Sequence, residues 1–481
     1  MRIIAQSNLR KIGKLYKNIA LAVILNLTIK PVNLLLENVV QDRIGHAAYG
    51  IYAALNALAF LFIVVVDLGL NQFLTKRFAS ETSIDPDKLS TYFSFKLVLA
   101  ILYPFIMVVI GYLLGYSNQE LFILFLISIS YSVYQLIMYV RAKFQASQFF
   151  TLDSLASISD KTLLIVFTFL LLAIGITLNN YIEVRLLAML LSLVIVFVPA
   201  VKVYTLKAFS FKWNHDAWKG ILKQTYPFAF ITVLFSIHDK IDQVMIERML
   251  GDHASGLYAG AYRWLDAFMM FLWIILPMFF ARFAFLKNNP RELAATLTMS
   301  QIISGIPMIF VSCFVWFHGE QLFFLLGRSS AAEIVEMTVC LKILFIAVCI
   351  HAFFACLGTL LSAAGGENYI NRMLLISIVM NVVLNIVLLP VMGISGAAAA
   401  TVISTLFISV SYLVYIIQKE HISIDFNVAV KLLILLLVTF SAFYVCGQFQ
   451  IVWWLAAVLS GVLLLSTVFL LRLHVFIQKY N

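Results

Sequence analysis

Eight ionisable side chains lie inside long apolar stretches of this 481-residue sequence. Four are cationic and could bind an anionic group, and four are carboxylates that could bind a proton or a sodium ion. If the apolar stretches cross a bilayer, exposing each charge to lipid would cost about 3 kcal/mol. The charges are therefore expected to face one another or water. They are Lys30, Asp67, Asp239, Lys240, Asp242, Arg263, Asp266 and Lys342.

Helical spacing relates some of these charges. Asp239 and Asp242 are three residues apart, as are Arg263 and Asp266, so each pair shares one face of a helix. Both pairs could handle a substrate or a coupling ion, or they could simply lock two adjacent helices together. We predict a substrate-binding set of the four cations, and a set of coupling-ion or ion-pair carboxylates. The first set is Lys30, Lys240, Arg263 and Lys342, and the second is Asp67, Asp239, Asp242 and Asp266.

The elements that position these charges are membrane spans. Hydrophobic residues make up 63% of the chain and charged residues 12%, against roughly half and roughly a quarter in a soluble protein. We predict an all-α, multi-pass membrane protein with about 14 transmembrane helices of bilayer length. The predicted spans are 19–40, 47–74, 89–114, 120–142, 156–178, 183–206, 222–248, 256–282, 293–317, 333–362, 368–390, 394–418, 429–447 and 450–471.

Lysine and arginine alternate between successive connections of this map. One set of connections and ends holds 25 of them, counting Lys96, and the opposite set holds 3, namely Arg43, Arg248 and Arg328. Because cationic loops stay on the cytoplasmic side, this split places both termini in the cytoplasm of a bacterium, across its cytoplasmic (inner) membrane. The net charge of +10 is thus explained by topology, and no nucleic-acid partner is expected.

An internal repeat organises the chain. Residues 45–53 match residues 251–259 at a constant offset of 206, with six predicted spans between them. An even number of spans gives both copies the same orientation, so we predict two six-helix lobes related by an axis along the membrane normal, plus two C-terminal helices. The predicted parts are an amphipathic cytoplasmic N-terminus 1–18, an N-lobe 19–206, a cytoplasmic linker 207–221, a C-lobe 222–418, a C-terminal helix pair 429–471 and a cytoplasmic tail 472–481.

Several chemistries lack their motifs in this sequence. It contains no phosphate-binding GxxxxGK[ST] loop, no HExxH and no GxSxG, and its five cysteines have no metal-ligand spacing. We therefore expect no enzymatic activity, no metal site and no cofactor beyond H+ or Na+ coupling.

Three segments carry a resemblance. The first is Ile44–Tyr52 followed by Val66–Leu70, the second is Ile241–Tyr258, and the third is Asn381–Pro390 followed by Gly393–Thr401. In these segments the chain resembles a known family, the polysaccharide exporters of the multidrug/oligosaccharidyl-lipid/polysaccharide (MOP) flippase superfamily. The resemblance implies a central cavity and alternating access. It also implies that an isoprenoid-pyrophosphate-linked oligosaccharide moves from the inner to the outer leaflet for surface polysaccharide synthesis.

Cationic residues would then meet the pyrophosphate. The implied partners are the polyprenyl-pyrophosphate-linked glycan and membrane lipids, with a polysaccharide polymerase or glycosyltransferases nearby, and a monomer is expected. Two alternatives from the same superfamily stay open at this point: a lipid II flippase and a drug/cation antiporter. The four buried cations count against the antiporter, and the sequence does not separate lipid II from other lipid-linked glycans.

Overall fold

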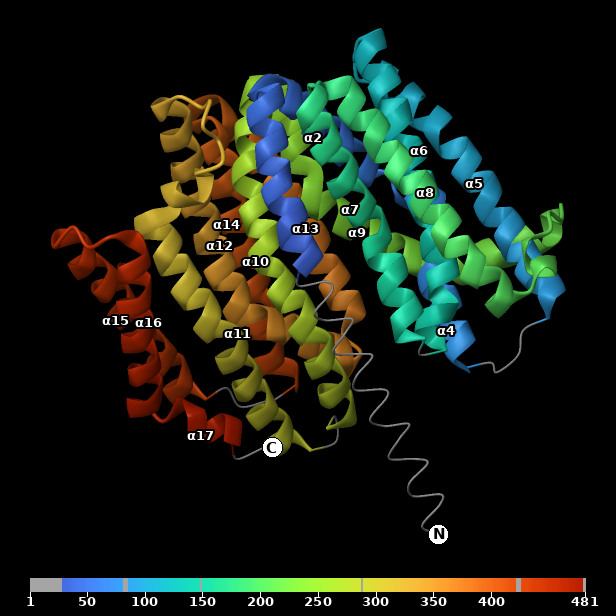
Figure 1. Cartoon of the computed structure of the whole chain (residues 1–481). Coiled ribbons are helices and arrows are strands. Elements are labelled where there is room, and N and C mark those ends of the chain that lie inside the picture. The colour runs from blue at the N-terminus through green and yellow to red at the C-terminus, as the bar shows by residue number, and fades with distance from the viewer. Residues whose placement is uncertain (1–27, 81–84, 148, 287–288, 421–424, 479–481) are drawn as a thin grey trace, which may run out of the picture. The chain divides into compact units, whose positions relative to one another are not determined.

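The computed structural model describes residues 28–80, 85–147, 149–286, 289–420 and 425–478. The described residues form helices and connections without a β-strand (Figure 1). Residues 28–44 are helical. The remaining elements are α2 (His46–Leu61), α3 (Val64–Asp67), α4 (Leu70–Ser80), α5 (Pro86–Leu113), α6 (Asn118–Ala146), α7 (Phe150–Ile174), α8 (Leu178–Tyr204), η1 (Leu206–Phe209), α9 (His215–Leu250), α10 (Asp252–Phe285), α11 (Pro290–His318), η2 (Gly319–Phe323), α12 (Ala331–Ala364), α13 (Glu367–Met392), α14 (Ile394–Tyr415), η3 (Ile416–Glu420), α15 (Phe426–Gln448), α16 (Trp453–Leu470) and α17 (Leu473–Gln478).

Length and hydropathy mark many of these helices as membrane-spanning. Within the described residues, 11 helices are long and apolar enough to cross a bilayer, or 12 if the bent helix α9 counts as one span. The all-helical, multi-pass membrane fold is therefore confirmed. The count of about 14 is not, because the first predicted span begins outside the described residues and the second is broken into three short helices.

The break in the second predicted span lies at Leu68 and Gly69. Both residues adopt a left-handed conformation, with φ of 46° and 76°. Asp67 ends α3, and its Oδ1 accepts a hydrogen bond from the backbone N–H of Asn71 at 3.3 Å, in the first turn of α4. A carboxylate beside a helix start stabilises the free N–H groups there, so Asp67 helps α4 to begin directly after the break.

Side-chain caps set several other helix starts. Ser117 with Glu120, Thr177 with Asn180, and Ser330 with Glu333 form capping boxes before α6, α8 and α12. Each box satisfies backbone N–H groups that have no partner within the helix. These boxes lie in connections that the charge pattern predicts to be external.

The two copies of the internal repeat have the same local structure. Gly45 and Gly251 precede α2 and α10 with φ of 87° and 90°, a region that glycine enters without steric cost. Each donates its N–H to the carbonyl four residues earlier, at 2.9 Å and 3.0 Å. Tyr52 and Tyr258, at equivalent positions of the repeat, are both buried.

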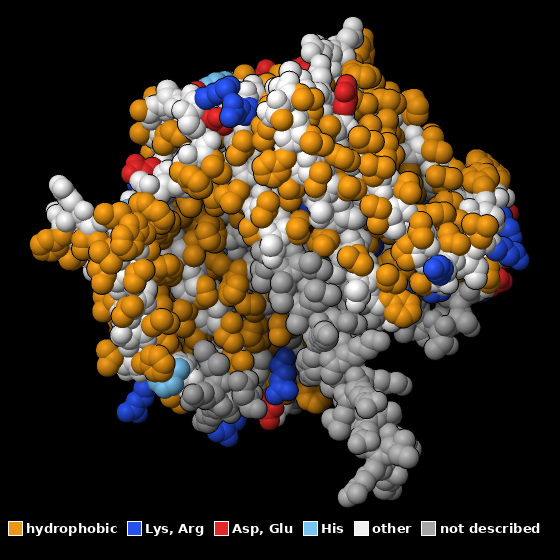
Figure 2. Space-filling model, in the orientation of Figure 1, with side chains coloured by type: hydrophobic (Ala, Val, Ile, Leu, Met, Phe, Trp, Pro, Cys, Tyr) orange, Lys and Arg blue, Asp and Glu red, His pale blue; other side chains and the backbone are white. Residues whose placement is uncertain are grey.

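The chain divides into two compact units, Met1–Val244 and Met245–Asn481. The predicted boundary between the lobes, at 207–221, remains a prediction. In the first unit α6 packs against α2, α4, α5 and α8, and in the second α12 packs against α10, α11 and α14. On the face shown in Figure 2, apolar side chains cover most of the surface, as a bilayer would require.

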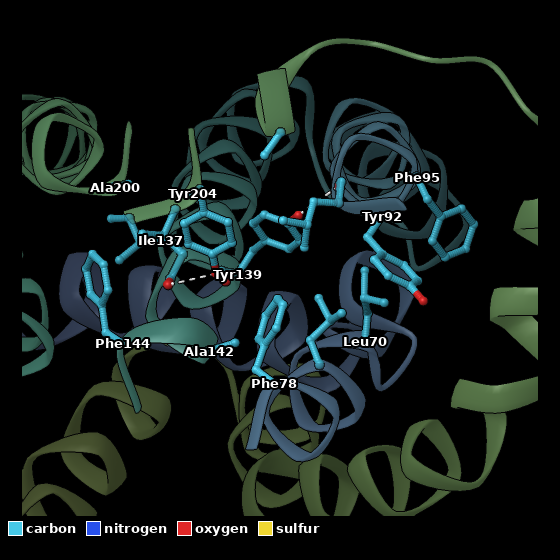
Figure 3. Packing of buried hydrophobic residues seen from close by; sticks show 14 of the residues in the cluster. Leu70, Phe78, Tyr92, Phe95, Ile137, Tyr139, Ala142, Phe144, Ala200 and Tyr204 are labelled. Atoms are coloured by element: carbon cyan, nitrogen blue, oxygen red, sulfur yellow. Dashed lines mark hydrogen bonds between the residues drawn. The ribbon is translucent and has the colours of Figure 1, made fainter. Parts of the chain in front are cut away.

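A core of aromatic and aliphatic side chains joins α4, α5, α6 and α8 in the first unit (Figure 3). Tyr139 and Tyr204 stack with ring centroids 6.0 Å apart, and the Tyr204 hydroxyl donates to the Tyr139 carbonyl at 3.0 Å. Leu70, the first residue of α4, is fully buried in this core. The short helix after the break is therefore held by packing on its neighbours.

Candidate functional site

Lys30 in the first unit lies within electrostatic range of charges on α6 and α7, and we call this group the Lys30 cluster. It consists of Lys30 on helix 28–44, Arg141 on α6, and Asp153, Asp160 and Lys161 on α7. Lys30 interacts electrostatically with Lys161, Arg141 and Asp160. Helix 28–44 and the consecutive helices α6 and α7 thus contribute three cations and two carboxylates to one group.

Two of the three cations already have a counter-ion. Arg141 donates from Nε and Nη2 to the two carboxylate oxygens of Asp153, at 2.7 Å and 3.2 Å, which is the bidentate geometry of a strong ion pair. Lys161 Nζ lies 2.9 Å from Asp160 Oδ2. Lys30 is half-buried and forms no hydrogen bond or ion pair with any residue that the structure describes. The cluster therefore has one uncompensated positive charge, and an anion is its complementary ligand.

A second group is the Asp67 network, formed by Asp67, Asn71, Lys96 and Gln135. Lys96 Nζ lies 2.6 Å from Asp67 Oδ1 and donates to Gln135 Oε1 at 3.1 Å. Asn71 Nδ2 donates to the same Gln135 oxygen at 2.6 Å. Lys96 is 0% exposed, so its charge depends on these contacts.

The position of Lys96 differs from the prediction. The charge pattern places Lys96 among the cations of a cytoplasmic connection, but it lies inside α5 and is completely buried. A lysine near a predicted span end resembles a loop residue when only local sequence is considered. Its partner Asp67 is 29 positions away, a separation from which no helical spacing rule could infer the contact.

A third group is the Glu37 cluster, formed by Glu37, Tyr49, Tyr181 and Arg185. Glu37 Oε1 accepts from Arg185 Nη1 and from the Tyr181 hydroxyl, both at 2.7 Å, and Glu37 Oε2 accepts from the Tyr49 hydroxyl at 2.8 Å. The Arg185 guanidinium also lies 5.1 Å from the centre of the Tyr52 ring. Glu37 and Arg185 are not among the predicted site residues, and they are 148 positions apart in the sequence.

The remaining predicted site residues lie on α9, α10 and α12. Asp239 Oδ2 lies 3.2 Å from Lys240 Nζ, and Asp242 is buried on the same helix. Arg263 and Asp266 are half-buried on α10. Their roles in substrate or ion handling remain predictions.

Lys342 lies in a different setting from the other predicted cations. It lines a cavity of about 230 Å³ in the second unit, between α11, α12 and α15. Lys342 thus lies beside residues of α11 and α15 in the second unit. Lys30 interacts with residues of α6 and α7 in the first unit. The two cations therefore have different neighbours.

Solved structures with a similar fold include membrane flippases and transporters. A lipid II flippase MurJ in an inward closed conformation matches with a TM-score of 0.77 at 14% identity, over 95% of this chain and 100% of MurJ. An inward-facing multidrug resistance MATE family transporter of the MOP superfamily matches with a TM-score of 0.64 at 14% identity, over 83% of this chain and 98% of that one. A MOP superfamily transporter from Pyrococcus furiosus matches with a TM-score of 0.60 at 13% identity, over 85% and 96% of the two chains. At these identities the matches establish the fold.

The fold is thus one that flippases and transporters of the MOP superfamily also adopt. Residues 15–280 match the model of the polysaccharide biosynthesis protein family, and the chain belongs to that family. No curated protein matches the sequence.

Proposed function

We propose that this protein is a flippase that moves an isoprenoid-pyrophosphate-linked oligosaccharide from the inner to the outer leaflet of the bacterial cytoplasmic membrane, by alternating access. The observation that carries the proposal is the uncompensated charge of the Lys30 cluster, in a chain of the polysaccharide biosynthesis family. A sugar head group cannot cross hydrocarbon unaided, because its hydrogen-bonding groups would lose water without replacement. A polar passage with an anion-binding site removes that obstacle.

The arrangement of the Lys30 cluster suits a site that must also release its ligand. Lys30 would attract the pyrophosphate first, since it forms no ion pair with a described residue. Arg141 and Lys161 could then turn toward the phosphate oxygens, and after release they would pair again with Asp153 and Asp160. The two carboxylates thus compete with the substrate and keep its binding reversible.

Substitution of Lys30 by methionine tests this function. A hydrogen bond to a charged group contributes about 1.5–3 kcal/mol, so we expect binding of the lipid-linked pyrophosphate to weaken about 10- to 100-fold. In cells, lipid-linked repeat units should accumulate while surface polysaccharide falls. The measurements are glycan labelling at the cell surface and substrate binding to the purified chain.

Two variants serve as controls. Lys30→Arg retains the charge and should retain export. Lys88→Met removes an exposed lysine at the start of α5, outside the cluster, and should leave export unchanged. Normal export and normal binding by a stable Lys30→Met protein would refute the role of the cluster.

The substrate assay also separates the alternative functions. Purified protein in vesicles would be offered a polyprenyl-pyrophosphate oligosaccharide, lipid II or a cationic drug. Flipping of lipid II alone would establish the lipid II alternative, and drug uptake alone would establish the antiporter. Measuring flipping with a sodium gradient and with a pH gradient distinguishes Na+ from H+ coupling through Asp67, Asp239, Asp242 or Asp266.

A further inference from the structure

The cavity beside Lys342 has the features of a lipid site, and we call it the Lys342 pocket. Its walls come from α11, α12 and α15 and include Trp316, Ile346, Leu436 and Phe440. Ser312 also lines it, but its hydroxyl already donates to the carbonyl of Phe345 at 3.2 Å. Lys342 is therefore the one charged group in an otherwise apolar lining.

Lys342 has no partner within the part of the chain that the structure describes. It is half-buried, and it forms no hydrogen bond or ion pair with a described residue. Lys96, Arg141, Lys161 and Arg185 all have a carboxylate within 3 Å. A cation inside a membrane span is costly when it is unpaired, so a counter-ion from outside the chain would stabilise Lys342.

The pocket opens at the apolar surface of its unit. Trp316 and Ile346 are each 39% exposed and Phe440 is 38% exposed, although all three line the cavity. Val339 on α12 and Leu437 on α15 are further exposed apolar side chains of these helices. A molecule that enters the Lys342 pocket would therefore come from lipid.

Depth and size favour a phospholipid. Lys342 lies 11 residues after Ala331, the start of α12, which is about 16 Å along the helix axis. A helical side chain points toward the helix N-terminus, so the ammonium group can reach several Å closer to the head-group level. A volume of about 230 Å³ is below the 300–1,000 Å³ typical of a site that encloses a whole small molecule. It suits part of a lipid whose remainder stays in the bilayer.

We propose that the Lys342 pocket binds an anionic phospholipid of the leaflet at the end of the bundle where α12 begins, which the charge pattern predicts to be the outer one. The lipid phosphate pairs with Lys342 Nζ, and an acyl chain lies along Trp316, Ile346 and Phe440. This site is independent of the Lys30 cluster. Lys342 would then bind a lipid of the surrounding membrane, whereas the sequence predicts that it binds the transported substrate.

Native mass spectrometry of the full-length protein tests the proposal. The purified chain would be titrated with phosphatidylglycerol and, separately, with phosphatidylcholine. Wild type should bind a first phosphatidylglycerol more tightly than a first phosphatidylcholine. In Lys342→Met this preference should fall about fivefold, because one cation near a membrane surface contributes about that factor.

Three variants make the result specific. Lys342→Arg should keep the preference, and Lys419→Met, which removes an exposed lysine in η3, should leave it unchanged. Phe440→Ala should weaken the binding of both lipids to a similar extent, since it removes an aromatic side chain that would contact the acyl chain. As a second measurement, phosphatidylglycerol should raise the unfolding temperature of wild type and not that of Lys342→Met.

An unchanged preference in Lys342→Met would overturn the proposal. So would a first site that accepts only the polyprenyl-pyrophosphate glycan and not phosphatidylglycerol, because that result would return Lys342 to the transport path. If Lys342→Met does not fold, Lys342→Gln takes its place with the same two expected results.

Discussion

Replacing Lys96 by methionine is expected to lower the free energy of unfolding by about 3–5 kcal/mol. Lys96 Nζ and Asp67 Oδ1 are 2.6 Å apart, and the two side chains are only 0% and 8% exposed. Removing the cation would leave the Asp67 carboxylate buried without its counter-ion. Unfolding of the purified protein, followed by intrinsic fluorescence in detergent, measures the loss.

A double substitution identifies the cause. Asp67→Asn combined with Lys96→Met removes both charges, and the amide oxygen of asparagine can still accept from the N–H of Asn71. Most of the lost stability should return. As a comparison, Lys207→Ala breaks an exposed pair with Asp87, in which the side chains are 64% and 46% exposed, and no measurable change is expected. If Lys96→Met is as stable as wild type, the buried ion pair does not stabilise this unit.

The positions of the long helices could be predicted because they depend on local hydropathy. The predicted span 120–142 corresponds to α6 at Asn118–Ala146, and 368–390 corresponds to α13 at Glu367–Met392. Where helix starts differ, polar caps explain the difference. The helix α8 begins at Leu178 and not near 183, because the capping box of Thr177 and Asn180 precedes the apolar run.

The contacts between charges could be predicted only in part. A spacing of three or four residues places two side chains on the same face of a helix. This rule predicts the pairs Asp239 with Asp242 and Arg263 with Asp266. The ion pair between Glu37 and Arg185 joins residues 148 positions apart. Such contacts depend on which helices pack together. The apolar sequence patterns do not determine this, because many helices have similar apolar faces.

The break in the second span was also beyond local reasoning. The sequence predicts residues 47–74 as one continuous helix, since isolated glycines in an apolar run are compatible with a helix. The structure divides this stretch into α2, α3 and the first part of α4. What distinguishes Gly69 is its neighbour in space, the first part of α9, which the sequence does not reveal.

Substitution of Gly69 by alanine is the second large effect that we expect, with a loss of about 2–5 kcal/mol. Gly69 has φ of +76°, and an added Cβ would lie 2.6 Å from the backbone nitrogen of Ala229 and 2.7 Å from the carbonyl oxygen of Thr225. The left-handed conformation costs a side-chain-bearing residue about 1–2 kcal/mol, and overpacking adds about 1–3 kcal/mol. The measurement is the yield of folded protein together with its unfolding temperature.

Gly115→Ala separates these two contributions. Gly115 has a similar φ of +81°, but an added Cβ there would meet no atom within 4 Å. Gly115→Ala should therefore show the conformational cost alone, and the difference between the two variants measures the close approach of α9 to the break in the second span. Because backbone atoms of α9 cannot move aside as a flexible side chain would, that difference should be large. Equal losses in the two variants would mean that α9 does not pack on Gly69, and that the Asp67 network alone holds the break.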